Sequence, residues 1–227
     1  MKPRSPKEIA EEIFQVGGEE HTSFEDAAVY LIRFEDHAAL VDAGTGRYTA
    51  ALLDQIRKCS VDPKGIQYIL LTHCHFDHTG GVNALKKLSG CRVIAHALDA
   101  QYLEQGDNRI TAAGWYGADL EPFRVERKLT GFQEDILLGQ RVVTAYHTPG
   151  HSPGSVVYVT ESGGQKVLFG QDVHGPLDES LRSNREDYIR SLQFLLSLDV
   201  DILCEGHYGV FRGKDRIRRF IRSFLDA

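Results

Sequence analysis

Three histidines and an aspartate are concentrated in one short stretch, THCHFDHTGG, which a glycine pair closes. His73 and His75 are two positions apart, so in an extended segment their side chains point to the same side while Cys74 points away. Asp77 and His78 follow where the glycines turn the chain into a helix. From there they can point toward a second centre a few ångströms from the first.

Imidazoles and carboxylates without paired thiolates are the ligands that suit zinc, and iron and manganese also fit. A single His or Asp at a strand end is usually a hydrogen-bonded structural group, but the clustering in HCHFDH argues against that explanation here. One metal with three protein ligands keeps a position open for water, and two metals can share a water and lower its pKa. The stretch therefore predicts a metal site that activates water.

Short apolar, β-branched runs recur and predict strands, several of them buried on both faces, and segments with helical spacing lie between them. No repeat or linker divides the chain, so we expect one domain, residues 1–227, of layered α/β or α+β architecture. The strand runs begin at Ala27, His37, Ile66, Cys91, Arg141, Ser155, Lys166 and Val200, and the helical segments begin at Arg47, Gly80, Asn184 and Lys214.

Four of these strands end in a potential ligand or its support. The residues are Asp42 after ALV, His73 after ILLT, Asp172 after VLFGQ and His207 after ILCEG. Polar residues delivered from the ends of apolar strands commonly build a site along one edge of a sheet.

The composition is that of a soluble globular protein, with 42% hydrophobic and 26% charged residues. No apolar run approaches the length of a membrane span, and the N-terminal segment turns acidic where a secretory signal would be apolar. The four cysteines form no CxxC pair, which favours free thiols and a cytoplasmic location. The net charge of −6 argues against a nucleic-acid partner and leaves a small molecule as the expected one.

The sequence resembles the metallo-β-lactamase superfamily through five motifs in that family's order. In chain order, the first motif is VDAG, with Asp42, and the second is HxHxDH, with His73, His75, Asp77 and His78. The last three are TPGHSPGS with His151, FGQD with Asp172, and EGHYG with His207. The resemblance covers almost the whole chain. It implies the four-layer αβ/βα sandwich, with metals at one edge between the two sheets.

The resemblance also implies roles for these residues. Two zinc ions are expected, with iron or manganese as alternatives. Asp77 would orient a hydroxide bound by both metals and pass a proton to the leaving group. The first metal would be held by His73, His75 and His151, and the second by Asp77, His78 and His207. Asp172 would bridge the two metals, and Asp42 would orient a ligand histidine without touching a metal itself.

Several hydrolytic substrates remain open. Glyoxalase II enzymes, which hydrolyse glutathione thioesters, match the metal ligands, although their substrate-binding helices follow the last histidine and only 20 residues follow His207 here. Lactonases of the family typically place a tyrosine three residues after the bridging aspartate, where this chain has Gly175. True β-lactamases typically lack the bridging Asp172, and the acidic total disfavours a nuclease. We expect a thioester or other small acyl ester.

A redox alternative comes from the persulfide dioxygenases, which share the fold and bind one iron. By matching position their ligands would be His73, His151 and Asp172. Asp77, His78 and His207 complete a second metal site, and for that reason we favour hydrolysis.

Two loops are expected to form the pocket: residues 106–123, a lid or wall that a homodimer partner could share, and a flap from Gly17 between the first two strands. An alternative is that the aromatic pair Trp115 and Tyr116 only anchors the first loop to the core. His147, His174, Cys74 and the arginines of the C-terminal helix are expected to be structural or solvated, with contact to substrate as the alternative for the histidines and anion binding for the arginines.

Overall fold

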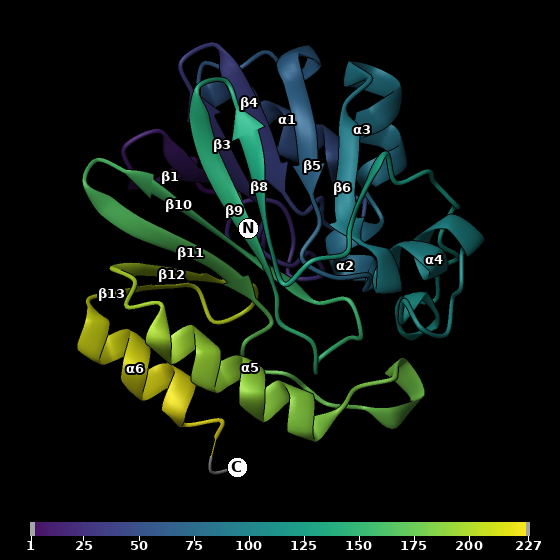
Figure 1. Ribbon diagram of the computed structural model, residues 1–227. Coiled ribbons are helices and arrows are strands. Elements are labelled where there is room, and N and C mark those ends of the chain that lie inside the picture. Colours follow the sequence, from purple (N-terminus) through teal and green to yellow (C-terminus); the bar gives the residue numbers. More distant parts are fainter. Residues whose placement is uncertain (1–2, 226–227) are drawn as a thin grey trace.

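Two β-sheets pack face to face in the computed structural model, which describes residues 3–225 (Figure 1). The first sheet has seven strands in the order β1 (Lys7–Ala10), β2 (Ile13–Gln15), β3 (Tyr30–Phe34), β4 (His37–Val41), β5 (Ile66–Leu70), β6 (Arg92–His96) and β7 (Arg127–Leu129). The second has six, in the order β13 (Val210–Arg212), β12 (Ile202–Glu205), β11 (Gln165–Gln171), β10 (Val156–Ser162), β9 (Arg141–His147) and β8 (Gln133–Leu138).

Helices cover the outer face of each sheet, which gives four layers (Figure 1). The first sheet carries α1 (Thr49–Lys58), α3 (Val82–Ser89) and α4 (Ala97–Gln105), and the second carries α5 (Arg185–Ser197) and α6 (Lys214–Arg222). The short α2 (Phe76–Thr79) and the 3-10 turns η1 (Pro63–Gly65), η2 (Ala113–Tyr116) and η3 (Glu179–Leu181) lie in the connections. The predicted four-layer sandwich is confirmed.

The central strands are mostly apolar because most of both their faces is buried. In β3, Tyr30 and Ile32 belong to the core between the two sheets, whereas Leu31 belongs to the core under α1 and α3. Successive side chains of a strand point to opposite faces, so a strand between two cores has no polar face. This explains the continuous apolar runs of the sequence.

Every predicted strand and helix coincides with an element, but the structure adds several that the patterns missed. β1, β2, β7 and β13 are three or four residues long, too short to show alternation. In α4 a buried carboxylate, Asp99, interrupts the apolar face. The predicted flap from Gly17 joins β2 to β3, not the first two strands, because a β1–β2 hairpin precedes it.

Strand direction decides where the site forms. β4, β5 and β6 are parallel, so the residues after β4 and β5 emerge at the same sheet edge. β11 and β12 are likewise parallel in the second sheet, and Asp172 and His207 follow them. The loops after these strands meet across the sandwich, which brings the motifs of the sequence together.

Candidate metal centre

The predicted ligands converge into two adjoining groups. Within each group the potential ligand atoms lie within 4.8 Å of one another. The first group is His73, His75, His151 and Asp172, and the second is Asp77, His78 and His207. Residues separated by more than a hundred positions in the sequence are thus assembled as the motifs predict.

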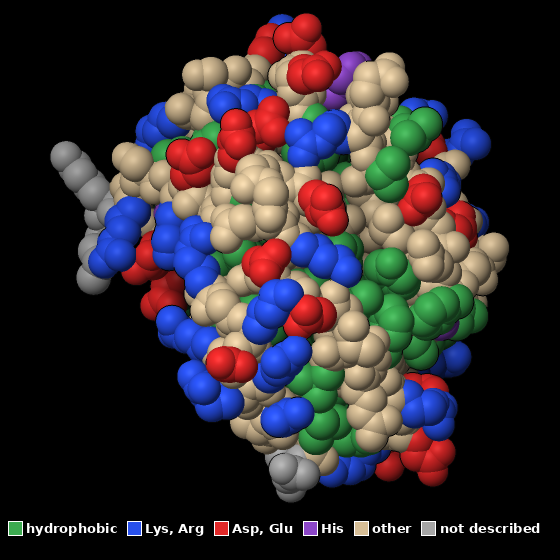
Figure 2. All heavy atoms as spheres, turned by 60° about the vertical axis from the view of Figure 1, so that its left-hand side comes forward, with side chains coloured by type: hydrophobic (Ala, Val, Ile, Leu, Met, Phe, Trp, Pro, Cys, Tyr) green, Lys and Arg blue, Asp and Glu red, His purple; other side chains and the backbone are tan. Residues whose placement is uncertain are grey.

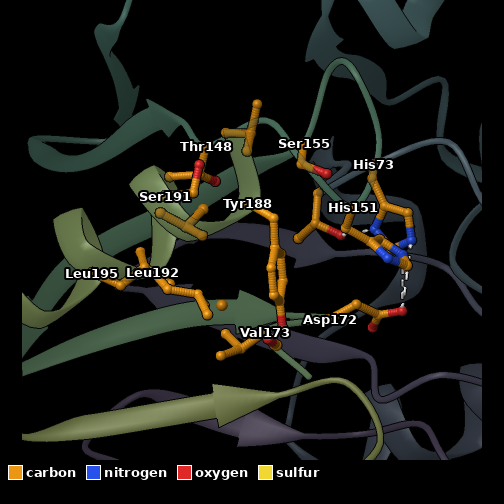
Figure 3. A pocket seen from close by; sticks show the side chains of 14 residues that line it. His73, Thr148, His151, Ser155, Asp172, Val173, Tyr188, Ser191, Leu192 and Leu195 are labelled. Carbon is orange, nitrogen blue, oxygen red and sulfur yellow. Dashed lines mark hydrogen bonds and ion pairs between the residues drawn. The ribbon is translucent and has the colours of Figure 1, made fainter. Parts of the chain in front are cut away.

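Asp172 lies between the two groups and presents one carboxylate oxygen to each. Its Oδ2 is 3.3 Å from Nε2 of His151 and 3.8 Å from Nε2 of His73. Its Oδ1 is 3.2 Å from Nε2 of His78 and 3.4 Å from Nε2 of His207. Figure 3 shows His73, His151 and Asp172 pointing toward one another at one end of a small cavity, with Tyr188 beside them. This is the arrangement of a carboxylate that two cations could share.

Local backbone structure aims the ligands of the HCHFDH stretch. His75 is the N-cap residue of α2, and the single turn of that helix carries Asp77 and His78. The end of α2 lies directly on the loop that follows β4: a Cβ at Gly81 would collide with the carbonyl oxygen of Ala43. The glycine pair is therefore required by close backbone approach.

Asp42 supports the site from behind. It is fully buried and adopts a left-handed backbone conformation, with φ of 62°. Its Oδ1 accepts a hydrogen bond from the Thr72 amide at 2.8 Å, and its Oδ2 accepts one from Nδ1 of His78 at 2.6 Å. Because Nδ1 of His78 donates to a carboxylate, Nε2 is the nitrogen that remains to bind a metal. His151 is oriented similarly, with Nδ1 donating to the Pro176 carbonyl at 2.8 Å.

The atoms that face the centre are buried and lack hydrogen-bond partners among residues 3–225. They are the Nε2 atoms of His73, His75, His78 and His151, and Oδ1 of Asp172. Buried polar atoms are almost always satisfied, so such a cluster needs an explanation. Imidazole nitrogens and carboxylate oxygens together are a donor set that fits divalent metals, zinc among them.

The charges of the site also favour a cation. Burial lowers the pKa of His75 to about 3, with neighbouring His151 adding to the effect, so this imidazole is neutral at pH 7. Burial opposes protonation of His207 as well, but the carboxylates of Asp172 and Asp77 outweigh it and raise the pKa to about 10. The two carboxylates therefore attract positive charge, which either a proton or a metal can supply.

These pKa shifts predict proton release on metal uptake. His207 of the metal-free protein holds a proton at pH 7, because its pKa is raised, and a metal must displace that proton. Apparent zinc affinity should rise about tenfold per pH unit for each proton released, up to the raised pKa. Calorimetric titrations of zinc in buffers with different ionisation enthalpies measure the number released. A release that is unchanged in His207→Ala would contradict the prediction.

One positioning residue, Asp99 of α4, was missed by the sequence analysis. Its Oδ2 accepts hydrogen bonds from the Cys74 amide at 2.9 Å and the Ser152 hydroxyl at 2.6 Å, and its Oδ1 accepts one from the Gly154 amide at 2.7 Å. It thus ties the loop of His73 to the loop of His151. In the sequence this carboxylate looks like an ordinary acidic residue in the first turn of a helix.

The remaining histidines and Cys74 lie outside the ligand groups. His147 stacks on His96, with ring centroids 3.8 Å apart. His174 lines the cavity beside the centre, and its Nδ1 is 2.7 Å from a carboxylate oxygen of Glu205. Cys74 is fully buried in the core between the first sheet and its helices, which agrees with the prediction that it is a structural residue.

The basic side chains of α6 are exposed, and some of them form ion pairs with acidic residues. Arg218 and Lys214 form ion pairs with Asp199 at 2.8 and 2.6 Å. Figure 2, which brings the left-hand side of Figure 1 forward, shows acidic and basic side chains intermixed on this face. This is the solvated charged surface that we expected.

A cavity of about 230 Å³ lies against the ligands. Trp115 and Tyr116 of the 106–123 segment line it, so the predicted pocket wall is confirmed. The same segment is also anchored to the core, because Leu120 and Phe123 are buried there.

The fold is that of solved metallo-beta-lactamases. The chain superposes with a TM-score of 0.81 on BJP-1, a subclass B3 enzyme of Bradyrhizobium japonicum, at 24% identity over 99% of this chain and 92% of that one. With FEZ-1 from Legionella gormanii the TM-score is 0.83 at 20% identity, over 99% and 94% of the two chains. At this identity the likeness shows the fold alone. None of the helices that the structure describes has the length and apolarity that a bilayer crossing requires.

Sequence comparison adds relatives with other activities. The chain is 28% identical over 248 residues to the acyl-coenzyme A thioesterase MBLAC2 of Homo sapiens, covering 96% of this chain and 86% of that protein. It is 29% identical over 200 residues to the hydroxyacylglutathione hydrolase of Aeromonas salmonicida (strain A449), covering 82% and 63%. The sequence model of the metallo-beta-lactamase superfamily matches residues 23–207. The chain therefore belongs to the metallo-beta-lactamase superfamily.

Proposed function

We propose that this chain is a hydrolase that uses two divalent metals, zinc in the first instance, to cleave thioesters. The observation that carries the proposal is the pair of ligand groups joined through Asp172 at the wall of a cavity. His73, His75 and His151 would hold one metal and Asp77, His78 and His207 the other, with Asp172 shared and Asp42 fixing His78. The complete second group favours two metals over the single iron of a dioxygenase.

Bound metals would lower the pKa of a water that they share and polarise the substrate carbonyl. The residues of the chain would do the rest. Oδ2 of Asp77 faces Nε2 of His207 at 3.3 Å, and the other carboxylate oxygen, Oδ1, would accept a proton from the attacking water. The same oxygen would return that proton to the departing sulfur. Water adds to the carbonyl carbon, the carbon–sulfur bond breaks, and a carboxylic acid and a thiol leave.

The choice of a thioester rests on the relatives. One is named an acyl-coenzyme A thioesterase and another a hydroxyacylglutathione hydrolase, whose substrate is also a thioester. Gly175 stands where a lactonase of the family would carry its tyrosine, which disfavours lactones. A cavity of about 230 Å³ beside the ligand groups would receive the reacting part of such a substrate.

The test begins with metal content, measured by elemental analysis on protein purified without added metal or chelator. We expect about two zinc or manganese ions per chain and, after that, zinc-dependent hydrolysis of acyl thioesters with weaker action on lactones and phosphodiesters. Dialysis against a chelator should abolish the activity, and zinc should restore it. One iron per chain with oxygen-dependent turnover of a persulfide would replace the proposal with dioxygenase chemistry.

Asp42 offers a test of the support behind the ligands. Asp42→Ala removes the acceptor for Nδ1 of His78, so the imidazole loses its fixed orientation. Zinc affinity should fall about 10–100-fold, as for other residues that orient metal ligands. Competition with a fluorescent chelator measures it. Asp54→Ala, an exposed carboxylate of α1, is the control and should bind zinc as the parent does.

A further inference from the structure

We infer that the acyl chain of the substrate binds along an apolar wall of the cavity, formed by Ala112, Trp115, Tyr116, Pro176 and Leu181. We call this surface the acyl wall. The inference rests on the proposed thioester hydrolysis and names the part of the thioester that the enzyme recognises.

The cavity is lined by side chains of two chemical kinds. Side chains of both ligand groups line it, among them His75, Asp77 and Asp172, and so do the five residues of the acyl wall. No Lys, Arg, Asp or Glu belongs to the acyl wall. A carbonyl held at the ligand groups could direct its hydrocarbon tail along the apolar surface, where burial of each methylene is favourable. The polar thiol carrier would lie toward solvent.

The acyl wall is held in place before any substrate arrives. The ring of Tyr116 packs against the ring of Phe76, with centroids 5.6 Å apart. The backbone carbonyl of Tyr116 accepts a hydrogen bond from the Arg47 guanidinium. The Leu120 amide donates to Oδ1 of Asn108 at 2.8 Å, which closes the loop around η2. A preformed surface loses little conformational entropy on binding, so it can discriminate between chain lengths.

Trp115 forms the rim of the acyl wall. It remains 61% exposed, while Ala112 and Leu181 of the same cavity are almost completely buried. An exposed tryptophan beside a cavity leaves a large apolar surface in water until a ligand covers it. We therefore expect Trp115 to contribute to binding of longer acyl chains and not of an acetyl group.

A chain-length series tests this expectation on the zinc-loaded enzyme with acetyl, hexanoyl and decanoyl thioesters of coenzyme A. The parent should prefer the longer chains. Trp115→Ala should lower kcat/KM for the decanoyl thioester about tenfold and leave the acetyl thioester within about twofold. Phe132→Ala is the matched control, because Phe132 is 59% exposed and lines a different pocket. An equal loss for all chain lengths would overturn the inference and leave thioester hydrolysis standing.

A second measurement does not depend on turnover. Trp115 is the single tryptophan of the chain, so intrinsic fluorescence reports directly on the acyl wall. Decanoate and a non-hydrolysable decanoyl thioether of coenzyme A should each shift the emission to shorter wavelength, whereas free coenzyme A should not. A shift with no hydrolysis of any thioester would support the acyl wall and refute the proposed reaction. A shift by free coenzyme A alone would assign the wall to the thiol carrier and overturn the inference.

Discussion

Asp172→Asn should reduce the metal content to about one ion or fewer per chain and lower kcat/KM for a thioester by at least about a thousandfold. The two oxygens of Asp172 face different ligand groups, His73 and His151 on one side and His78 and His207 on the other. An amide keeps the shape of the side chain but replaces one oxygen with a nitrogen that cannot bind a cation. The substitution therefore removes one of the two bridging contacts and the whole of the shared negative charge.

Elemental analysis and steady-state kinetics measure the two effects, and circular dichroism verifies that the fold is intact. Asp54→Asn makes the same chemical change on the exposed surface of α1 and should alter neither quantity. If Asp172→Asn kept both metals and full activity, Asp172 would not be a shared ligand and the two-metal proposal would fail.

The second large effect is expected from Asp99→Asn. This carboxylate accepts three hydrogen bonds from the two loops that carry His73, His75 and His151, and it is 1% exposed. An amide offers one acceptor oxygen and turns an N–H group toward buried N–H or O–H donors. Hydrogen bonds to charged groups contribute about 1.5–3 kcal/mol each, so we expect a loss of about 3 kcal/mol in the free energy of unfolding. Zinc affinity should fall as well, because the loops lose their connection.

Denaturant unfolding with and without zinc separates the two consequences. Ser152→Ala removes one of the three donors and should cost about 1–2 kcal/mol, less than Asp99→Asn. A merely structural carboxylate would lower stability without changing the zinc affinity of the folded protein. That result would restrict Asp99 to the fold and remove it from the positioning of the site.

Much of the site could be predicted from sequence because each of its residues belongs to a short motif that can be recognised by itself. The HCHFDH stretch encodes two ligand pairs through alternation along an extended segment and a single helical turn. Asp42, His73, Asp172 and His207 each follow an apolar strand, and that position alone predicts a shared sheet edge. Apolar runs without a polar face likewise predict strands between two cores.

Features that depend on contacts between distant segments could not be predicted in this way. Asp99 is indistinguishable from a surface residue in the sequence, because its three donors come from loops that only the folded chain brings to it. The short β1, β2, β7 and β13 exist because neighbouring strands supply their hydrogen bonds.

The sequence by itself predicted the residue types of the metal site, their order along the chain and the layered α/β fold, and its net charge argued against a nucleic-acid partner. Only the tertiary structure decided that the two oxygens of Asp172 face different ligand groups and that Trp115 and Leu181 form one apolar surface beside them. The physical reason is that side-chain chemistry and backbone periodicity are local properties. The distance between two loops is instead set by the packing of both sheets and all of their helices.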